Sequence, residues 1–485
     1  MANAVNPPRG MRDFLPAEKA HRERLLAIIR SSYRAHGFDE IETPVAEDSD
    51  RLHAGLGGDN EKLAFGIQRR GLTHDDLQAA QEPLDLVDLG LRFDLTVPLA
   101  RFYASHRAAL PAVFRSIQLA PVWRAERPQK GRYRQFVQCD IDIIGEPSNR
   151  AEAELLIASL DTIDRLGLEG AFVRINDRRL LIGMLETLGF PVAEHERALI
   201  TIDKLDKIGQ DGVVDELREA GFTAAAVDAL GFAAGEQDAV LITVDKLDKI
   251  GQDGVVAELR ERGVTPAAVD ALESFFRRPM TMEYLPFGDR AIRRALPEGA
   301  DEAVIAELAA LGDAVRAARR RPDVGAEELE MQSVLLEFDP FLVRGMGYYT
   351  GPIFELAHPS VPYSLGGGGR YDGMIGRFLG TDMPATGFSL GFERLVDLLE
   401  MDAEDGAPAT ALLYDDDVPL ATLLTLKTEL LAGGGRVRLV GRPKNTKSLL
   451  EVLEAEGFTR FAFVDAQVDG VAGLELRPLG SRPGA

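Results

Sequence analysis

The densest group of chemically useful side chains lies in residues 122–136, which read VWRAERPQKGRYRQF. The segment holds four arginines and one lysine against a single acid, Glu126. Because a guanidinium group binds two oxygens of a phosphate or carboxylate at once, this composition favours an anion site. The alternative is a charged β-hairpin on the surface. We predict strands over residues 113–125 and 134–145, with the charged turn Arg127–Arg132 between them.

Further polar and aromatic residues stand in three short runs outside this segment. Residues 91–98 read LRFDLTVP, residues 138–142 read QCDID and residues 342–350 read LVRGMGYYT. On residue type alone, Asp94 is typical of a surface carboxylate, and Tyr348–Tyr349 is typical of a strand that fills a core. Both alternatives stay open until the runs are considered together.

A frame of helices and strands must hold these residues in place. Apolar residues at helical spacing predict a helix over residues 16–37. The run Phe38–Pro44 is predicted to be a strand that stops at its proline. Residues 84–102 have β-branched and aromatic residues that alternate with charges, so a further strand is expected there.

The middle of the chain, residues 151–335, is rich in alanine, leucine and glutamate and is predicted to be mostly helical. Within it, Leu199–Arg218 recurs as Leu241–Arg260, with eighteen of twenty residues identical at an offset of 42. Two copies are fewer than the roughly three that a solenoid needs, so we interpret them as a local duplication. A second docking surface is the alternative. Strand-like sequence returns at residues 336–360, and Gly366–Gly369 is expected to form a tight backbone passage.

The last 77 residues, 409–485, are predicted to be a small α/β domain that follows an acidic linker at residues 401–408. The expected strands are Ala411–Tyr414, Val437–Val440 and Phe461–Val464, and the expected helices are Leu420–Leu431 and Thr446–Glu456. Nine basic residues nearly balance ten acidic ones in this domain. Five of the basic residues lie close together with no acid between them: Arg436, Arg438, Arg442, Lys444 and Lys447. Such a strip is equally typical of a nucleic-acid contact and of a solvated surface.

The composition argues against several classes of protein. A net charge of −23 disfavours broad, non-specific binding to nucleic acid. No apolar run reaches the length of about 18 residues that a membrane span needs, and residues 1–15 lack the apolar core of a signal peptide. The single cysteine, Cys139, indicates a reducing compartment, so a cytoplasmic location is expected. No cluster of cysteine and histidine has metal-ligand spacing.

Taken together, these runs resemble the class II aminoacyl-tRNA synthetases, in the form typical of the histidyl family. Motifs 1, 2 and 3 of that class correspond to Gly37–Pro44, residues 122–136 and Gly387–Leu395. The histidine-binding strands of the family correspond to residues 91–98 and 138–142, and its two histidyl signatures to residues 342–350 and 368–373. The resemblance covers residues 8–400 in the family's order, and it is specific as a set although each run alone is weak.

The resemblance implies an α+β fold, with an antiparallel class II sheet, flanking helices and a helical insertion at about residues 175–330. The catalytic domain would span residues 1–400, the linker residues 401–408, and an anticodon-binding α/β domain residues 409–485. The duplicated segment, 199–218 and 241–260, would lie in the insertion. Motif 1 builds the dimer interface in that class, so a homodimer is implied.

The resemblance also implies an activity and a role for each residue. The chain would activate histidine with ATP, which carries Mg²⁺, and transfer it to the 3′ end of tRNA(His), with no metal held by the protein. Arg124 and Arg344 would be catalytic. Histidine would contact Asp94, Leu95, Thr96, Arg124, Gln138, Asp142, Arg344, Tyr348, Tyr349 and Tyr371. ATP would contact Arg124, Glu126, Arg132 and Arg394, and tRNA would contact Gln129, Arg436, Arg442, Lys444 and Lys447.

Two features depart from the family's pattern. Gly347 stands where the first histidyl signature usually has aspartate, which removes an acid beside Arg344. The duplication adds a second copy of a segment that the family has once. The competing interpretation is a catalytically inactive paralogue that serves as regulatory subunit of ATP phosphoribosyltransferase. That paralogue lacks the C-terminal domain and typically loses the arginines, whereas this chain keeps Arg124, Arg344 and Arg394.

Overall fold

The computed structural model describes residues 5–53, 63–128, 132–187, 287–296, 299–319, 336–340, 342–343, 348–399 and 408–479, together with Val213 and Leu217. Most of the predicted helical insertion, with nearly all of both repeat copies, lies outside the described residues. The chain divides into two compact units. One consists of Met1–Met11 and Ile28–Leu395, and the other of Arg12–Ala27 and Val396–Ala485.

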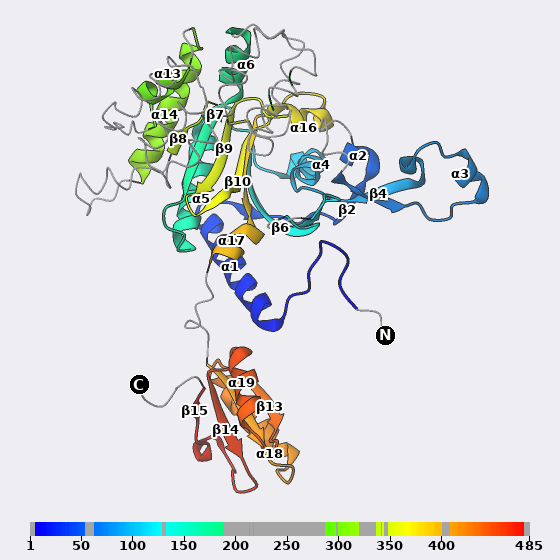
Figure 1. Cartoon of the computed structure of the whole chain (residues 1–485), viewed down its shortest axis with the longest axis vertical. Helices are drawn as coiled ribbons and strands as arrows, with labels where there is room; N and C mark the ends of the chain where they lie inside the picture. The colour runs from blue at the N-terminus through cyan, green and yellow to red at the C-terminus, as the bar shows by residue number, and fades with distance from the viewer. Residues whose placement is uncertain are drawn as a thin grey trace, which may run out of the picture. The chain divides into compact units, whose positions relative to one another are not determined.

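The first unit is built on an eight-stranded sheet in the order β1-β5-β6-β11-β10-β9-β7-β8 (Figure 1). Neighbouring strands are antiparallel, except that β1 pairs with β5 and β8 with β7 in parallel at the two edges. The strands are β1 (Asp39–Glu40), β5 (Phe114–Trp123), β6 (Gln135–Ile144), β7 (Phe172–Asp177), β8 (Leu336–Phe338), β9 (Pro352–His358), β10 (Val361–Arg370) and β11 (Ala385–Gly391).

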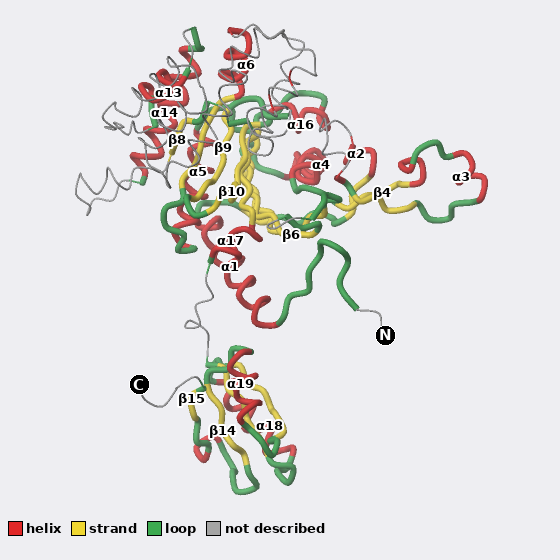
Figure 2. Tube along the Cα trace, in the orientation of Figure 1, coloured by secondary structure: helices red, strands yellow, loops and turns green. Residues whose placement is uncertain are grey.

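Helices flank this sheet, as the secondary-structure colouring in Figure 2 shows. Helix α5 (Arg150–Arg165) packs on β6 and β11, and its buried residues Ala151, Leu155, Ala158 and Thr162 recur at the helical spacing of three and four. Helix α14 (Glu302–Ala318) packs on α5 and on α13 (Asp289–Ala295). The remaining helices of this unit include α6 (Arg178–Thr187) and α17 (Phe392–Leu398), and α1 (Pro16–Ala35) begins in the other unit.

A hydrophobic core forms around helix α4 (Thr96–His106) and helix α16 (Asp372–Leu379), which contact each other. Its buried members include Phe93, Leu99, Tyr371 and Ile375. Val213 and Leu217, both helical and fully buried, belong to the same core. The first repeat copy therefore contributes two apolar side chains to the body of the first unit.

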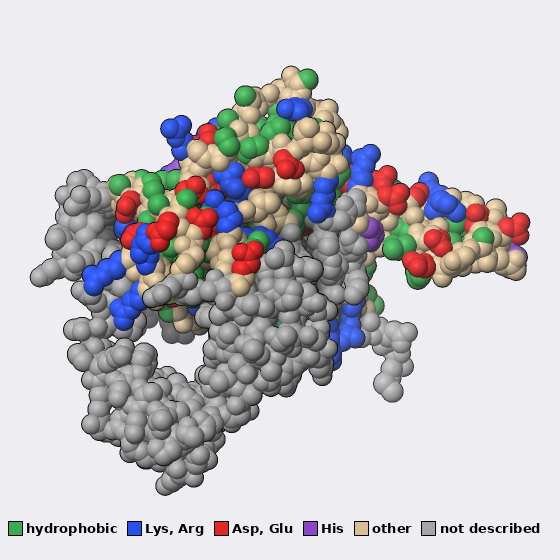
Figure 3. Space-filling view, turned by 90° about the horizontal axis from the view of Figure 1, so that it is seen from above, with side chains coloured by type: hydrophobic (Ala, Val, Ile, Leu, Met, Phe, Trp, Pro, Cys, Tyr) green, Lys and Arg blue, Asp and Glu red, His purple; other side chains and the backbone are tan. Residues whose placement is uncertain are grey.

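A second, three-stranded sheet in the order β2-β4-β3 forms an arm on the first unit. It consists of β2 (Ala46–Asp48), β3 (Phe65–Gln68) and β4 (Val87–Leu91), with α2 (Ser49–His53), α3 (His74–Ala79) and a 3₁₀ turn, η2 (Pro83–Leu86). Figure 3 shows the arm projecting, with more acidic than basic side chains on the visible face. Its exposed acids are Asp75, Glu82, Asp85 and Asp88.

The second unit contains a four-stranded sheet in the order β13-β12-β14-β15. It is made of β12 (Ala409–Tyr414), β13 (Arg436–Gly441), β14 (Arg460–Val464) and β15 (Arg477–Pro478), with helices α18 (Leu420–Ala432) and α19 (Lys447–Ala455). Strand β12 is parallel to both of its neighbours, as expected when helices connect them. The predicted strands and helices of this α/β domain are confirmed, and β15 is an additional antiparallel strand.

Two strand predictions were wrong. Residues 84–102 form a strand only over Val87–Leu91, and helix α4 begins at Thr96. Asp94 Oδ1 accepts the Val97 N–H at 3.2 Å, and Pro98 falls in the first turn, where a helix tolerates proline. The predicted strand Phe38–Pro44 is reduced to Asp39–Glu40, because Thr43 and Pro44 give their carbonyl oxygens to the Arg92 side chain instead of to a strand.

Candidate active site

Strand β6 supplies a row of polar side chains to one face of the main sheet. Because successive side chains on a strand point to opposite faces, Gln138, Asp140 and Asp142 share one face. Asp140 and Asp142 are each 5% exposed. Tyr371, directly after β10, donates its hydroxyl hydrogen bond to Asp142 Oδ1 at 2.6 Å. The structure therefore brings together two of the residues that the sequence assigned to histidine.

Glycines leave the strands beside this row bare of side chains. Gly387 on β11 lies opposite Asp142 and also pairs with Gly369 on β10. A Cβ atom on Gly387 would lie 2.0 Å from Asp142 Oδ1, so only glycine leaves room for that carboxylate. The predicted backbone passage at Gly366–Gly369 lies within β10, where the glycine row lets neighbouring backbones and side chains approach closely.

Three tyrosines stand together at this end of the sheet. The Tyr348 ring lies 4.6 Å from that of Tyr349 and 6.2 Å from that of Tyr371, measured between ring centroids. The Thr350 N–H donates to the Arg370 carbonyl at 2.7 Å, which holds the Tyr348–Tyr349 segment against the end of β10. All three tyrosines that the sequence assigned to histidine therefore lie in one cluster with Asp142.

The segment that carries Asp94 is fixed over the same face by two side chains of the β5–β6 hairpin. Arg124 donates through Nε to the Phe93 carbonyl at 3.0 Å, and Gln118 donates to the Leu95 carbonyl at 3.0 Å. Gln118 lies opposite Asp140 across the two strands, so Asp94 is placed near the polar row. Leu95 is fully buried, and Thr96 is half-buried at the start of α4.

In the predicted anion-binding hairpin, two of the four arginines lie beside one carboxylate. Arg124 and Arg132 lie 4.0 and 3.7 Å from the two carboxylate oxygens of Glu126. Arg124 also lies over the Phe136 ring, 5.1 Å from its centroid. Both arginine side chains keep part of their surface in solvent, so they can accept an anion. Gln129 lies outside the described residues.

Arg394 in α17 donates to the Ser364 carbonyl, and its guanidinium lies 5.4 Å from the centroid of the Tyr363 ring. It is thus placed at the start of β10, and β11 leads directly into its helix. Arg344 and Gly347 lie outside the described residues, so the structure does not place the second predicted catalytic arginine.

Burial shifts the acids of the polar row toward their neutral forms. Desolvation raises the pKa of Asp94 to about 6 and that of Asp142 to about 7, although hydrogen bonds from Val97 and from Tyr371 oppose the shift. Desolvation, with the nearby Asp142 charge, also holds the pKa of Asp140 well above its usual range. Among the described residues, no group of three histidines, cysteines or acids is arranged to hold a metal ion.

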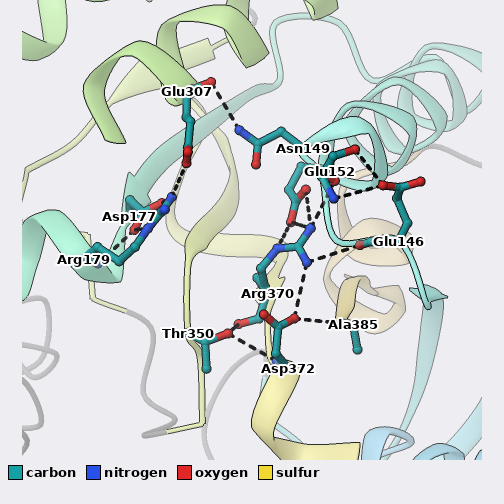
Figure 4. A network of polar contacts seen from close by, with 11 residues as sticks. Glu146, Asn149, Glu152, Asp177, Arg179, Glu307, Thr350, Arg370, Asp372 and Ala385 are labelled. Atoms are coloured by element: carbon teal, nitrogen blue, oxygen red, sulfur yellow. Dashed lines mark hydrogen bonds and ion pairs between the residues drawn. The ribbon is translucent and has the colours of Figure 1, made fainter. Parts of the chain in front are cut away.

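A buried ion pair supports the Tyr371 end of the site (Figure 4). Arg370 reaches Glu152 on α5 with two hydrogen bonds, of 2.7 and 2.8 Å. Asp372 accepts from Arg370 at 3.3 Å and from the Ala385 N–H at 2.9 Å. The residues on both sides of Tyr371 are therefore fixed by charged partners.

The predicted tRNA-binding strip lies at the edge of the sheet in the second unit, because β13 is its outer strand. Arg436 and Arg438 lie over the Phe458 ring, 4.5 and 4.7 Å from its centroid, and Arg438 pairs with Glu456. Arg442 pairs with Asp415 at 3.2 Å and lies over Phe463. Lys444 and Lys447 are exposed, in the loop and first turn that lead into α19. No ion pair to either lysine occurs within the described part of the chain.

Several residues of this site were not identified from the sequence. Asp140 lies between Gln138 and Asp142 on the same face, and Ser389 on β11 lies opposite it. Ser389 accepts a hydrogen bond from Gln138 Nε2 at 3.2 Å. The alternation in QCDID was a signal for Asp140, since every second residue of a strand shares a face. No local signal pairs Arg370 with Glu152, which are 218 residues apart.

A mainly antiparallel sheet that has an arginine-bearing hairpin and buried acids on one face is the arrangement of a class II aminoacyl-tRNA synthetase. The sequence profile described as "Histidyl-tRNA synthetase" matches residues 10–207 and 193–395. The chain belongs to the histidyl-tRNA synthetase family. The two matched stretches overlap where the first repeat copy begins.

Curated relatives and solved structures agree with this placement. A histidine–tRNA ligase of Leifsonia xyli subsp. xyli is 55% identical over 482 residues, which are 99% of each chain. A histidine–tRNA ligase of Aeropyrum pernix is 37% identical over 81% of this chain and 73% of the relative. A histidyl-tRNA synthetase structure from Nostoc sp. PCC 7120 superposes with a TM-score of 0.64 at 23% identity, covering 98% of this chain and 95% of that one.

A second solved structure, described as an ATP phosphoribosyltransferase regulatory subunit/histidyl-tRNA synthetase from Bacillus halodurans, gives the same TM-score of 0.64 at 19% identity. It covers 96% of this chain and all of that one. At this identity the likeness concerns the fold alone. Among the described helices, none has the length and apolar character needed to cross a membrane.

Proposed function

We propose that the chain, a histidine–tRNA ligase, performs both of its reactions with the residues gathered on the β5–β6–β11–β10 face. Histidine is first activated to histidyl-adenylate and then transferred to the 3′ end of tRNA(His), in the cytoplasm. One observation carries this proposal. Tyr371 is hydrogen-bonded to Asp142, and Arg124, at the other end of the same β5–β6 hairpin, is hydrogen-bonded to the segment that carries Asp94. The acids can bind the ammonium group of an amino acid. The arginine can bind its carboxylate and the phosphate of a nucleotide.

In the first reaction, a carboxylate oxygen of histidine forms a bond to the α-phosphorus of ATP, and the bond to the pyrophosphate oxygen breaks. Negative charge concentrates on the phosphate oxygens, and no proton needs to move, so positioning and electrostatic stabilisation supply most of the rate. We assign contact with the α-phosphate and the carboxylate to Arg124 and Arg344. We assign Glu126 and Arg132 to contact with the nucleotide. Arg394 binds the distal phosphates of ATP, which carries its own Mg²⁺.

Asp142 and Tyr371 distinguish histidine from other amino acids by contact with its ring. An ionised Asp142 accepts a hydrogen bond from one ring N–H, and the tyrosines Tyr348 and Tyr349 pack on the ring. Buried polar groups matched to a polar substrate strongly reject apolar analogues, because such an analogue leaves those groups without a partner. Asp94, Thr96 and Gln138 are assigned to the ammonium group.

In the second reaction, the oxygen of a hydroxyl at the 3′ end of the tRNA forms a bond to the carbonyl carbon of the adenylate. The bond from that carbon to the phosphate oxygen breaks, AMP leaves, and the hydroxyl proton is released. We assign the anticodon-side contact to residues 409–485, with residues 1–400 as the catalytic domain and 401–408 as the linker. Arg436, Arg442, Lys444 and Lys447 of the strip are exposed there, and the two lysines lie in the loop and first turn that lead into α19. The acidic arm is less suited to phosphate contact, since its exposed charges are mainly carboxylates.

We propose a homodimer formed through residues 37–45. Strand β1 is the edge of the main sheet, so a second copy has access to it. Just beyond it, Val45 is 43% exposed, and Pro44 is exposed as well. Phe38, by contrast, is 2% exposed and packs within its own subunit, so it contributes to the interface only indirectly.

Exchange of labelled pyrophosphate into ATP tests the activation step. The reaction should need histidine and should not proceed with other amino acids. Exchange that is independent of histidine, or absent from folded protein, would contradict the assignment and favour the regulatory paralogue. That paralogue shares the fold but not the reaction.

A further inference from the structure

Three acceptor oxygens in or beside the polar row of β6 have no hydrogen-bond partner among the described residues: Asp94 Oδ2, Gln138 Oε1 and Asp140 Oδ1. All three atoms are fully buried, and Asp94 and Asp140 are only 3% and 5% exposed as whole residues. A buried acceptor without a donor costs free energy, so native structures rarely keep one without a reason. Two of them on one face of β6, with the third on the neighbouring Asp94 segment, indicate a ligand that brings several donors.

Strand pairing and hydrogen bonds place these three side chains close together. Gln138 and Asp140 share a face of β6, and Ser389 lies opposite Asp140 and bonds to Gln138. Gln118, opposite Asp140 on the other side, holds the carbonyl of Leu95, the residue after Asp94. Asp94 and Asp140 are close enough for the charge of Asp94 to raise the pKa of Asp140.

The three atoms are carboxylate and amide oxygens, so they indicate a ligand group that donates hydrogen bonds. An ammonium group carries three N–H donors and no acceptor, and it prefers carboxylates and amide oxygens. A metal ion would need ligands arranged around one point, and the described residues contain no such group. Asp142, which we assign to the ring, lies two residues farther along β6, about 7 Å by strand rise.

We propose that Asp140 is a substrate-binding residue, which accepts an N–H of the substrate's α-ammonium group together with Asp94, Thr96 and Gln138. The proposal rests on the proposed function, because it takes histidine as the ligand. Ser389 orients the Asp140 carboxyl, and the ionisable groups around it include Asp142, Asp94, Arg124, Tyr371 and Tyr33. Burial and the Asp142 charge raise the pKa of Asp140 in the free site, and a bound ammonium group would lower it.

Two ligands that share the imidazole ring separate the ammonium contact from the ring contact. Histamine has the ring and the ammonium group, whereas 3-(imidazol-4-yl)propanoate has the ring and the carboxylate. Their dissociation constants would be measured by calorimetry with the full chain. Asp140→Asn should weaken histidine and histamine by about tenfold or more, the value of one hydrogen bond between charged groups. The propanoate and ATP should bind within about twofold of the parent.

Asp142→Asn is the matched control on the same strand, and it should weaken all three imidazole ligands together. If Asp140→Asn weakens histamine and the propanoate equally, Asp140 acts through the ring site, and the proposal is overturned. No change with any ligand would overturn it as well. Exchange by the parent that does not depend on histidine would instead refute the proposed function, and that is measured before any variant.

A measurement on the parent alone covers the case in which the variant does not fold. At pH 8, above the pKa values of about 6 and 7 of Asp94 and Asp142, histamine binding should release more protons than propanoate binding, because only the ammonium group lowers the raised pKa of Asp140. Calorimetry in two buffers of different ionisation enthalpy reports the number of protons released. Equal proton release with the two ligands would overturn the proposal.

Discussion

Arg370 and Glu152 form a buried, two-point ion pair between the end of β10 and helix α5. Their hydrogen bonds are 2.7 and 2.8 Å long, and the two side chains are 8% and 0% exposed. The next residue, Tyr371, bonds to Asp142. The ion pair is therefore a positioning device, because it fixes the backbone from which the Tyr371 hydroxyl reaches into the site.

Glu152→Gln should leave the Arg370 charge buried without its carboxylate. Breaking a buried pair in this way costs about 3–5 kcal/mol of the free energy of unfolding, which urea denaturation would measure. The KM for histidine in pyrophosphate exchange should rise several-fold, and the KM for ATP should change little, since we assign Tyr371 to the amino acid and not to the nucleotide.

The matched control for this prediction is Glu154→Gln on the same helix. Glu154 makes a similar two-point pair with Arg115, but the two side chains are 42% and 30% exposed. An exposed pair is worth about 0–1 kcal/mol, so the control should lose little stability and keep both KM values. Equal losses in the two variants would show that burial is not what gives the Arg370 pair its effect.

Tyr371→Phe should change the pH dependence of histidine binding. Burial raises the pKa of Asp142 to about 7, and the Tyr371 hydrogen bond opposes that rise by favouring the ionised form. Removing the hydroxyl should therefore raise the pKa of Asp142 further. Because the proposed contact with the substrate ring needs ionised Asp142, the rise of histidine affinity with pH should shift to higher pH.

Histidine dissociation constants measured between pH 6 and 9 would show this shift. Tyr103→Phe is the control, since Tyr103 is buried in the same core and its hydroxyl contacts Met383. The control profile should match the parent. A Tyr371→Phe profile that shifts to lower pH would contradict the assigned direction of the hydrogen bond's effect.

Deleting residues 219–260 should leave histidine activation within about twofold of the parent. The deletion removes one 42-residue period and joins Arg218 to Glu261 in register. It keeps Val213 and Leu217, which are fully buried in the core around α4 and α16. The measurement is histidine-dependent pyrophosphate exchange, together with circular dichroism to verify the fold. A folded deletion variant without exchange would mean that the second copy serves the reaction.

The double variant Val213→Ala/Leu217→Ala tests whether the first repeat copy stabilises the core around α4 and α16. Emptying two buried positions costs about 2–5 kcal/mol for a leucine and less for a valine, so its melting temperature should fall clearly. An unchanged melting temperature would show that the identical residues of the second copy, Val255 and Leu259, can replace the first pair.

Lys444→Glu/Lys447→Glu should impair charging of tRNA and spare activation. Both lysines are exposed, whereas Arg442 is held by Asp415 and packs on Phe463. Each lost phosphate contact lowers the salt slope of tRNA binding by about one. The KM for tRNA should therefore rise at physiological salt, while pyrophosphate exchange stays the same.

Lys427→Glu, on α18 of the same unit, is the control for a general change of charge. It should leave the KM for tRNA near that of the parent. Loss of both reactions in the double variant would indicate misfolding. Loss of neither would show that the strip at the sheet edge is a solvated surface.

Val45→Glu should weaken the dimer. The residue is 43% exposed next to the edge strand β1, and a charge there would have to be buried in a two-fold interface. Light scattering at micromolar concentration should give a dimer mass for the parent and a lower mass for the variant. Leu77→Glu, at a 51% exposed position on the arm, should stay dimeric. A monomeric parent would contradict the proposed homodimer.

Local pattern in the sequence was enough to predict many elements. The β5 and β6 strands, helix α1 and the strands and helices of the second unit follow from alternation and helical spacing, which act within about ten residues. The arginine-rich hairpin was likewise predicted from residue type, whereas the row Gln138 to Asp142 was assigned only through the family resemblance. Helix α4 was missed, because Asp94 and Gln118 fix its start through contacts that the alternating pattern of residues 84–102 does not contain.

The sequence by itself determined which groups are present: arginines for phosphate, acids and tyrosines for a ring and an ammonium group, and glycines where backbones approach closely. Only the tertiary structure decided how they act. Two contacts join segments far apart in the chain: that of Arg370 with Glu152 and that of Tyr371 with Asp142. The same folding brings Asp94, Gln138 and Asp140 together, each with an oxygen that has no partner among the described residues. The shifted pKa of Asp142 arises from burial by all of these segments at once, and desolvation depends on the assembled surroundings and not on neighbours in sequence.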